Sequence, residues 1–327
     1  MAKPTRHVPR VSSRRRIWVY VAVAAFLLVD ILLIAWALTG TRADAKVSAH
    51  RPIPTYSATP RTTAPTANPT PTPTASRSTE IVPVPPTRIL AAFDGTTAWR
   101  AETGACPAVK ASPELTTDSG ESWKSTDATG PTEVTALQRI KVSGPRVASM
   151  IGFSEADCSP QFVKTYVAGD SFKSYPEEVD TSWYVDPADR DTVHGPAGEF
   201  KAPCDSVIML APRDADAAAV LCADGEVFAT ADAAKTWSRP ATLAGVINIS
   251  VAQGGYIAAA AGRADCAGVQ ILPLSPELES GKAGCYPTKA SLKSLSGKVA
   301  LSEADGIIWL WAGDALARSS DEGVTWS

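Results

Sequence analysis

Hydrophobic and polar positions are sharply segregated along the chain, and the first long apolar stretch lies close to the N-terminus. Residues 17–39 begin IWVYVAVAAFLLVDILLIAWAL, in which Asp30 is the only charged residue. About 20 apolar residues with a rise of 1.5 Å each span the hydrocarbon core of a bilayer. This pattern predicts a single transmembrane helix over residues 17–39.

Basic residues before this helix set its predicted orientation. Residues 1–16 contain six basic residues and no acidic ones, and such a segment stays in the cytoplasm. Everything after residue 39 is therefore expected outside the plasma membrane. A cleaved signal peptide is the alternative, although its apolar region is typically about 7–15 residues long. The following body is exported under either interpretation.

Asp30 lies inside the predicted helix, where a carboxylate costs about 2.5–3.5 kcal/mol and often marks a function. One interpretation is a contact with a partner helix. The other is an acid that an otherwise strongly apolar helix tolerates. The sequence leaves both interpretations open.

A segment rich in threonine and proline follows over residues 40–86 and includes PTYSATPRTTAPTANPTPTPTAS. Few apolar residues remain there to build a core, so a disordered linker with much polyproline II character is expected. Its roughly 47 residues can reach on the order of 140 Å. The linker is either a stalk, which can carry glycans on its threonines, or a plain spacer.

The remaining residues, 87–327, alternate short apolar runs with turn residues, which predicts an all-β body. Three eight-residue segments in it are alike: TTDSGESW at 116–123, TADAAKTW at 230–237 and SSDEGVTW at 319–326. A degenerate fourth, TYVAGDSF at 165–172, lacks the Asp at the equivalent position and has Phe for Trp. The repetition predicts one hairpin used several times.

Each of these segments has the composition of a tight turn. A short carboxylate there accepts hydrogen bonds from backbone N–H groups of its own turn, and glycine supplies a positive φ without steric cost. The second segment departs from the pattern at Ala234. A tryptophan at the end is expected to pack the hairpin against its neighbour. The predicted structural residues are Asp118, Gly120, Trp123, Asp232, Trp237, Asp321, Gly323 and Trp326.

The shared pattern S/T-x-D-x-G-x-S/T-W resembles the Asp-box, or bacterial neuraminidase repeat. The body is therefore similar to the Asp-box β-propellers, a group that includes sialidases, sortilin-type receptors and photosystem-assembly-factor-like repeats. The resemblance implies a ring of four-stranded blades. It also implies that the box is a structural hairpin remote from any catalytic site.

The spacing of the boxes sets the expected number of blades. The Asp positions or their equivalents, 118, 167, 232 and 321, are separated by 49, 65 and 89 residues, and a propeller blade takes about 40–50 residues. The last gap fits two units, one of them without a box near 271–274. We therefore expect a β-propeller of about five blades, closed by an N-terminal strand at 88–93. The alternative fold is a β-sandwich.

All six cysteines lie in this body, and an even number in an exported domain predicts disulfides. Six cysteines allow fifteen connectivities, but two local pairs flank hairpin-like excursions and leave a third pair. The expected pairs are Cys106–Cys158, Cys204–Cys222 and Cys266–Cys285. A metal site is a poor alternative because the chain has no C-x-x-C motif and His194 is the only histidine of the body.

Charge and motifs limit the possible functions. From residue 89 onward there are 19 basic and 31 acidic residues, a net charge of −12, whereas binding nucleic acid requires a basic face. Neither a G-x-S-x-G nucleophile nor a glycine-rich phosphate loop is present. We therefore expect no catalytic, cofactor-binding or metal-binding residues and no nucleic-acid partner.

One segment, residues 172–187, gathers aromatic residues among acids and is a candidate ligand loop. It contains Tyr175, Trp183 and Tyr184, which form either an exposed loop that binds a sugar or a peptide, or the packing of a blade. The expected function is that of a membrane-anchored extracellular propeller, a non-enzymatic binding or scaffold module for an unknown protein or glycan. The alternative, from the resemblance, is an anchored sialidase-like glycoside hydrolase with an arginine triad and a tyrosine nucleophile. The sequence around 86–90 echoes the arginine element of that family only loosely.

Overall fold

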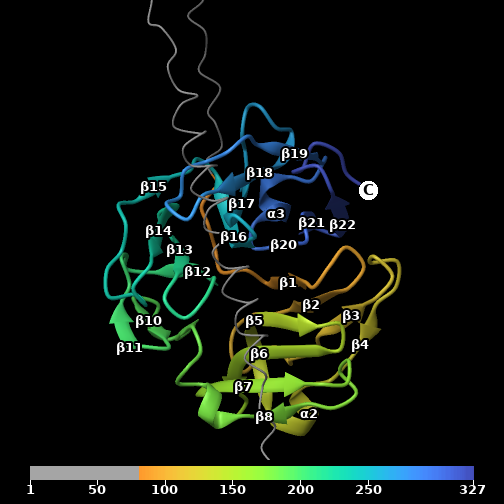
Figure 1. Ribbon diagram of the computed structural model, residues 1–327, viewed down its shortest axis with the longest axis vertical. Helices are drawn as coiled ribbons and strands as arrows, with labels where there is room; N and C mark the ends of the chain where they lie inside the picture. Colours follow the sequence, from red (N-terminus) through yellow and green to blue (C-terminus); the bar gives the residue numbers. More distant parts are fainter. Residues whose placement is uncertain (1–80) are drawn as a thin grey trace, which may run out of the picture. The chain divides into compact units, whose positions relative to one another are not determined.

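The computed structural model describes residues 81–327. The predicted membrane helix, with Asp30, and the linker up to residue 80 lie outside the described residues. No helix within residues 81–327 has the length and apolar character needed to cross a membrane. The described chain is all-β and forms a β-propeller, with six antiparallel sheets around a common centre (Figure 1).

The sheets follow one another in chain order and are numbered here as blades 1 to 6. Blade 1 contains β1 (Arg88–Ala92), β2 (Ala98–Glu102), β3 (Glu114–Thr116) and β4 (Lys124–Ser125), and blade 2 contains β5 (Val134–Gly144), β6 (Val147–Ser154), β7 (Pro160–Thr165) and β8 (Lys173–Ser174). Blade 3 contains β9 (Tyr184–Val185), β10 (Thr192–Gly195) and β11 (Gly198–Lys201), and blade 4 contains β12 (Val207–Pro212), β13 (Ala218–Cys222), β14 (Glu226–Thr230) and β15 (Ala241–Thr242). Blade 5 contains β16 (Val246–Ala252), β17 (Gly255–Ala261), β18 (Gly268–Leu274) and β19 (Gly284–Pro287), and blade 6 contains β20 (Val299–Ala304), β21 (Ile307–Ala312) and β22 (Ala315–Ser319).

Short helical turns occur only between strands of the described chain. They are α2 (Thr129–Thr132), η1 (Pro176–Glu178) and α3 (Leu292–Leu295). The first strands β1, β5, β12, β16 and β20 lie nearest the centre in Figure 1. Every residue of β17, whose sequence is GYIAAAA, is buried, because the neighbouring blades cover both faces of a blade in the ring.

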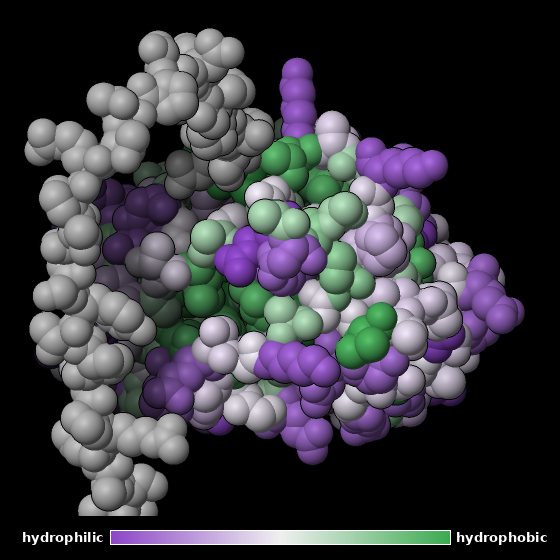
Figure 2. Space-filling view, turned by 90° about the horizontal axis from the view of Figure 1, so that it is seen from above, coloured by the Kyte–Doolittle hydropathy of each residue, from purple (hydrophilic) through white to green (hydrophobic). Residues whose placement is uncertain are grey.

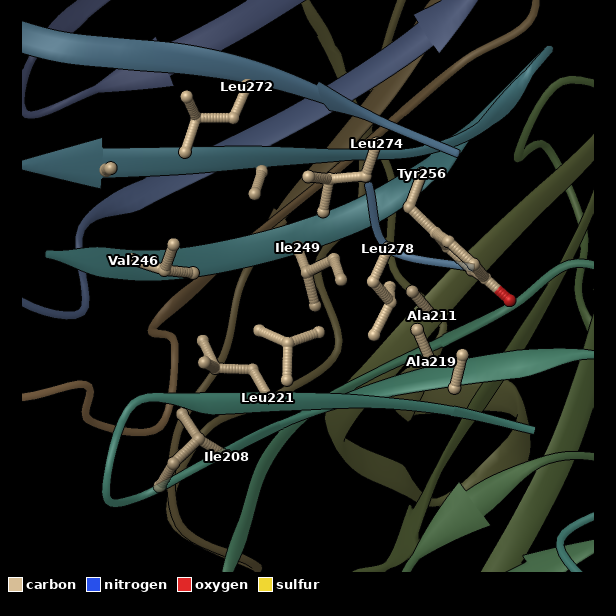
Figure 3. Close-up of a cluster of buried hydrophobic side chains, with 14 residues drawn as sticks. Ile208, Ala211, Ala219, Leu221, Val246, Ile249, Tyr256, Leu272, Leu274 and Leu278 are labelled. Atoms are coloured by element: carbon tan, nitrogen blue, oxygen red, sulfur yellow. The ribbon is translucent and has the colours of Figure 1, made fainter. Parts of the chain in front are cut away.

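Figure 3 shows this packing between blades 4 and 5. Leu221 and Ile208 of blade 4 face Ile249 and Val246 of blade 5 in one buried cluster. Burial of this kind contributes about 25 cal/mol per Å² of apolar surface. On the side of the ring shown in Figure 2, hydrophilic residues project over much of the surface and hydrophobic residues show in separate patches.

The ring closes where β1 lies beside β20. The N–H of Ala92 donates to the Ser302 hydroxyl at 2.9 Å, and the Trp309 indole N–H donates to the carbonyl of Asp94 at 3.0 Å. A strand at 88–93 was expected and is present, but it pairs with β2 of its own blade. The strand therefore takes part in ring closure, as the first strand of blade 1 packed against blade 6.

The expected number of blades is wrong, since the ring has six sheets where the spacing gave about five. The extra sheet is blade 3, which lies within the gap of 65 residues. Its strands contain two, four and four residues, and it has no acidic turn. The box-less unit expected near 271–274 is confirmed as blade 5.

The three predicted turns share one hydrogen-bonding pattern. The Thr116 hydroxyl donates to the Asp118 carboxylate and accepts the Gly120 N–H at 3.0 Å. In the second turn Ala234 has a φ of 67°, and its N–H donates to the Thr230 hydroxyl, also at 3.0 Å. Alanine at position 234 therefore does not change the turn, contrary to expectation.

All three predicted disulfides are present, and no free cysteine remains in the described chain. Their Cα–Cα distances are 6.0 Å for Cys106–Cys158, 6.3 Å for Cys204–Cys222 and 5.7 Å for Cys266–Cys285. The second disulfide joins the end of β13 to the segment before β12, which confirms the hairpin inferred from the two apolar runs.

Candidate functional site

Five of the six junctions between neighbouring blades contain a cluster of buried hydrophobic residues. These clusters lie between blades 1 and 2, 3 and 4, 4 and 5, 5 and 6, and 6 and 1. None of them joins blade 2 to blade 3. The junction between blades 2 and 3 is therefore the exception in the described ring, and its two facing surfaces are described next.

The two faces of blade 2 differ: one is apolar, and the other carries three cations beside the buried Ile151 and Phe162. Ile140 of β5 is paired with Met150 of β6, and both belong to the cluster shared with blade 1. Side chains of neighbouring residues in a strand point to opposite faces, so the flanking positions point towards blade 3. The second face carries Arg139 and Lys141 on β5, and Lys164 on β7.

A cavity of about 820 Å³ lies against this second face. Lys164 lines it from blade 2, while Glu178 and Trp183 line it from the segment that leads into blade 3. Most of its lining comes from the centre of the ring, where the first strands of blades 1, 2, 4, 5 and 6 surround it, and the part named above extends between blades 2 and 3. We call this cavity the 2–3 cleft.

A second cavity, of about 660 Å³, includes the start of the same first strands and the Cys106–Cys158 disulfide. Arg139 and Trp183 line both cavities. Arg139 therefore lies where the two cavities adjoin.

Arg139 has no carboxylate within ion-pair distance among residues 81–327. Its side chain is half-buried and lines both cavities. This removal from water lowers the pKa of the guanidinium to about 10, because a low-dielectric environment disfavours the charged form. Lys141, two residues along the same strand, is exposed and also has no ion pair within the described ring.

The third cation of this face is already neutralised. The Lys164 ammonium lies 2.9 Å from the Glu178 carboxylate on the opposite wall of the cleft. This hydrogen bond is the main reason that the pKa of Lys164 is raised. The pair bridges the walls and leaves Arg139 and Lys141 as the two available positive charges.

The other acids that line the cavity accept hydrogen bonds from backbone N–H groups or lie at the rim. The Asp214 carboxylate accepts N–H groups from Asp216 and Ala217, and the Glu303 carboxylate accepts those of Gln253 and Gly306. Asp305 is exposed at a turn. In the described ring, none of these acids forms an ion pair with either available cation.

Blade 3 is attached to blade 2 by a side chain in place of a hydrophobic core. The Gln138 amide donates to the carbonyl of Val185 and accepts its N–H, both at 2.8 Å. The two bonds satisfy the backbone of β9 as a neighbouring strand would. This fixes one end of the junction and leaves the cleft beside it open.

The aromatic segment lies next to the cleft, although its side chains are largely packed. Trp183 is only 4% exposed and donates from its indole to the carbonyl of Asp214 at 2.8 Å. Tyr184 stacks on His194 with ring centroids 4.3 Å apart, and Tyr175 is half-buried. Of the two alternatives for this segment, Trp183 follows blade packing, whereas a ligand role for the segment stays a prediction.

The acidic turns lie apart from the site. None of their Asp, Gly or Trp residues lines either cavity. The three carboxylates are occupied within their turns, each accepting the N–H of the Ser or Thr four positions later, at 2.8 to 2.9 Å. These residues therefore organise hairpins.

Three arginines line the 2–3 cleft and its continuation, but their side chains engage different blades. The Arg88 guanidinium lies over the Trp311 ring of blade 6 at 4.3 Å, and that of Arg213 lies over the Tyr256 ring of blade 5 at 5.7 Å. Only Arg139 lacks such a contact within residues 81–327. Residues 81–327 also contain no group of His, Cys, Asp and Glu residues arranged to hold a metal ion.

Arg139 and Lys141 were not predicted to be site residues, although the sequence around them contains an informative pattern. Residues 139–142 read RIKV, an alternation of cationic and apolar residues that normally predicts a strand with one face in water. Blades in a ring cover one another on both faces, so a polar face on a first strand must meet another blade. A strand with a polar face at a position that is covered on both sides indicates the junction that has no hydrophobic cluster.

No known protein-family model matches the sequence, and no curated protein matches it. Among solved structures, YCF48 from Cyanidioschyzon merolae is 15% identical over 76% of this chain and 87% of that chain, with a TM-score of 0.29. YCF48 bound to D1 peptide is 16% identical, over 76% and 83%, with a TM-score of 0.29. The WD40 β-propeller domain of Doa1 is 12% identical, over 73% and 92%, with a TM-score of 0.39. At these values the likeness concerns the fold alone.

Proposed function

We propose that this protein is a membrane-anchored extracellular binding module that holds a ligand in the 2–3 cleft without turning it over. The observation that carries the proposal is the missing hydrophobic cluster at this junction of the described ring. A junction without such a cluster forgoes the stabilisation that apolar burial gives its neighbours. A cavity with a few converging polar groups is the usual form of a ligand site.

The same residues argue for binding over catalysis. A sialidase-like hydrolase, the alternative, needs several converging arginines and an activated tyrosine. Arg88 and Arg213 are engaged with aromatic rings of other blades. Within the described ring, no tyrosine lines either cavity, whereas such a hydrolase uses a tyrosine as its nucleophile.

We also propose that the chain is a member of the Asp-box group. The three acidic turns and their common hydrogen bonds support this assignment. It assigns a structural role to the turns, in agreement with their separation from the cleft.

A cleft-filling variant tests the proposed function. Ser149 of β6 lines the cleft and forms no side-chain hydrogen bond within the described chain, so Ser149→Trp should fill it. Ser280→Trp, at an exposed position outside both cavities, is the matched control. The full-length chain in nanodiscs is assayed on arrays of neutral and acidic peptides and oligosaccharides.

The expected result is retention of a ligand by the wild type and by Ser280→Trp, its loss in Ser149→Trp, and recovery of the ligand intact by mass spectrometry. Equal retention by all three proteins would contradict the proposal. Hydrolysis of a fluorogenic sialoside that Arg139→Gln abolishes would establish the glycosidase alternative instead.

The proposed location has its own test. The full chain should remain in the membrane fraction after alkaline carbonate extraction, and a protease added outside intact cells should degrade the propeller. Deletion of residues 17–39 should release the protein from the membrane. A protein that carbonate extracts, or that is protected from external protease, would contradict the anchoring and orientation proposed here.

A further inference from the structure

We infer that the ligand of the 2–3 cleft is an extended peptide segment with acidic side chains at alternate positions, bound along β5 by Arg139 and Lys141. The inference rests on the proposed function, since it names the class of ligand for the same cleft. It is carried by the spacing of the two cations, by their lack of partners and by the charge of the body around them.

The spacing comes from the strand. Arg139 and Lys141 are two residues apart on β5, which pairs regularly with β6 at both positions. Their side chains therefore point to the same face, and their Cα atoms are about 7 Å apart at a rise of about 3.4 Å per residue. An extended peptide has the same geometry, so acids at positions i and i+2 present carboxylates at the matching interval.

The lack of partners makes these cations receptive. Arg139 is half-buried in the cavity lining and has no carboxylate partner within the described ring, and an unpaired charge that is partly withdrawn from water is unfavourable. An arriving carboxylate relieves that cost and meets a guanidinium whose planar fork binds carboxylates through two hydrogen bonds. Electrostatic attraction is also stronger there than in water.

The surrounding charge provides selectivity. The body has a net charge of −12 from residue 89 onward, so an acidic peptide is repelled from most of its surface. Glu178 neutralises Lys164, which limits the available positive charges of this face to two. Two acidic side chains are therefore the complement of this face of blade 2.

The dimensions favour a peptide segment over a folded partner. The cavity of about 820 Å³ includes the centre of the ring as well as the 2–3 cleft, and it is within the range of about 300–1,000 Å³ typical of sites for small ligands. One wall is β5, and the opposite wall contains η1 and Trp183. A single extended strand can enter between two such walls, whereas a folded domain would meet only their rim.

The test uses two fluorescein-labelled peptides of identical composition, Gly-Glu-Ser-Glu-Ser-Gly and Gly-Glu-Glu-Ser-Ser-Gly. Binding to the full-length chain in nanodiscs is measured by fluorescence anisotropy at low salt. The alternating peptide should bind about tenfold more tightly, because only it can pair with both cations, and one charge-assisted hydrogen bond is worth about that factor. Arg139→Gln and Lys141→Gln should each remove this preference.

Matched variants exclude indirect effects. Arg239→Gln and Lys289→Gln replace an exposed arginine and an exposed lysine outside both cavities and should leave the preference unchanged. Arg139→Lys keeps the charge without the planar fork and should restore part of the affinity. Because Lys141 is exposed, Lys141→Gln should fold normally even if substitution of Arg139 perturbs the strand.

The outcomes separate the two proposals. Equal binding of both peptides, or tighter binding of a pentagalacturonate than of either peptide, would overturn the inference about an alternating acidic peptide. If Ser149→Trp still abolished that binding, the 2–3 cleft would remain the site and the proposed function would stand. Peptide binding that Ser149→Trp leaves intact would contradict both the proposed function and the inference about the ligand.

Discussion

In the turns that follow the third strands of blades 1, 2, 4 and 6, a hydroxyl group closes the backbone. The hydroxyls of Thr116, Thr230 and Ser319 each accept the N–H four residues later, and so does that of Thr165 in the degenerate turn. The degenerate turn has no Asp at the usual position and still has this bond. The turn therefore depends on this hydroxyl more than on the Asp and Gly of the pattern, and Ala234 does not disrupt it.

Glycine is required at one of these turns for steric reasons. Gly120 has a φ of 89°, and a Cβ atom there would lie 2.5 Å from Leu316. Gly306 has a φ of 75° with nothing within 4 Å of the corresponding position. Gly306→Ala should cost about 1 kcal/mol of unfolding free energy from backbone strain alone. Gly120→Ala should cost about 1 kcal/mol more, because Leu316 must move.

Urea unfolding of both variants measures the difference between them. Equal destabilisation would show that Leu316 accommodates the methyl group without cost. Greater destabilisation by Gly306→Ala would contradict the packing described for blade 1 against blade 6.

The acidic turns also predict that the stability of the fold depends on pH. Hydrogen bonds from the Ser122 side chain and N–H lower the pKa of Asp118 from 3.8 to about 2, and those from Thr325 do the same for Asp321. A carboxyl whose pKa is lower in the folded state stabilises the fold above its unfolded pKa and loses this effect as the pH falls. The melting temperature should therefore fall between about pH 4 and pH 2.

Asp118→Asn and Asp321→Asn remove the titrating groups at these two turns. Each variant should have a lower melting temperature than the wild type at pH 6 and a smaller difference from it at pH 2. A difference that is constant from pH 6 to pH 2 would show that the carboxylates contribute nothing through their charge.

At the scale of strands and blades, the sequence predicted the units that carry a strong local pattern. The hairpin between β12 and β13, the three disulfides and the box-less blade 5 were all expected. Blade 3 was missed because residues 184–201 contain little apolar alternation and several turn residues. Its backbone is satisfied from outside by Gln138, a long-range contact that no local pattern reveals.

The junction between blades 6 and 1 depends on stacked cations and indoles. Trp311 lies between Arg88 at 4.3 Å and Arg100 at 4.9 Å, and Arg100 also lies over Trp123 at 4.0 Å. Trp311 is only 7% exposed. Trp311→Leu should therefore destabilise the protein by about 2–3 kcal/mol, from lost packing and lost cation–π attraction.

Hydrogen exchange locates this effect. Relative to the wild type, Trp311→Leu should increase the exchange rates of the amides of β1 and β20 more than those of β12 and β16. Trp237→Leu, at a half-exposed indole near blades 3 and 4, is the control that should leave β1 and β20 protected. Uniformly faster exchange in Trp311→Leu would argue against a local role in ring closure.

At the scale of the whole molecule, the described ring combines five apolar junctions with one polar junction. The number of blades and the polar junction could not be read from the sequence, because both depend on which blades meet. The strand that carries Arg139 and Lys141 was readable as a strand, but its partner surface was not. The proposed binding function therefore depends on the 2–3 cleft as the place where a ligand enters.

Photo-crosslinking tests that dependence most directly. The peptide Gly-Glu-Ser-Glu-Ser-Gly, with a diazirine at its C-terminal end, is irradiated with the full-length chain, and the crosslinked residues are identified by mass spectrometry. The account predicts crosslinks within residues 138–143, 149–151 and 176–183, which unlabelled peptide suppresses and Ser149→Trp abolishes. Crosslinks concentrated on the acidic turns or on the outer strands, unaffected by Ser149→Trp, would contradict it.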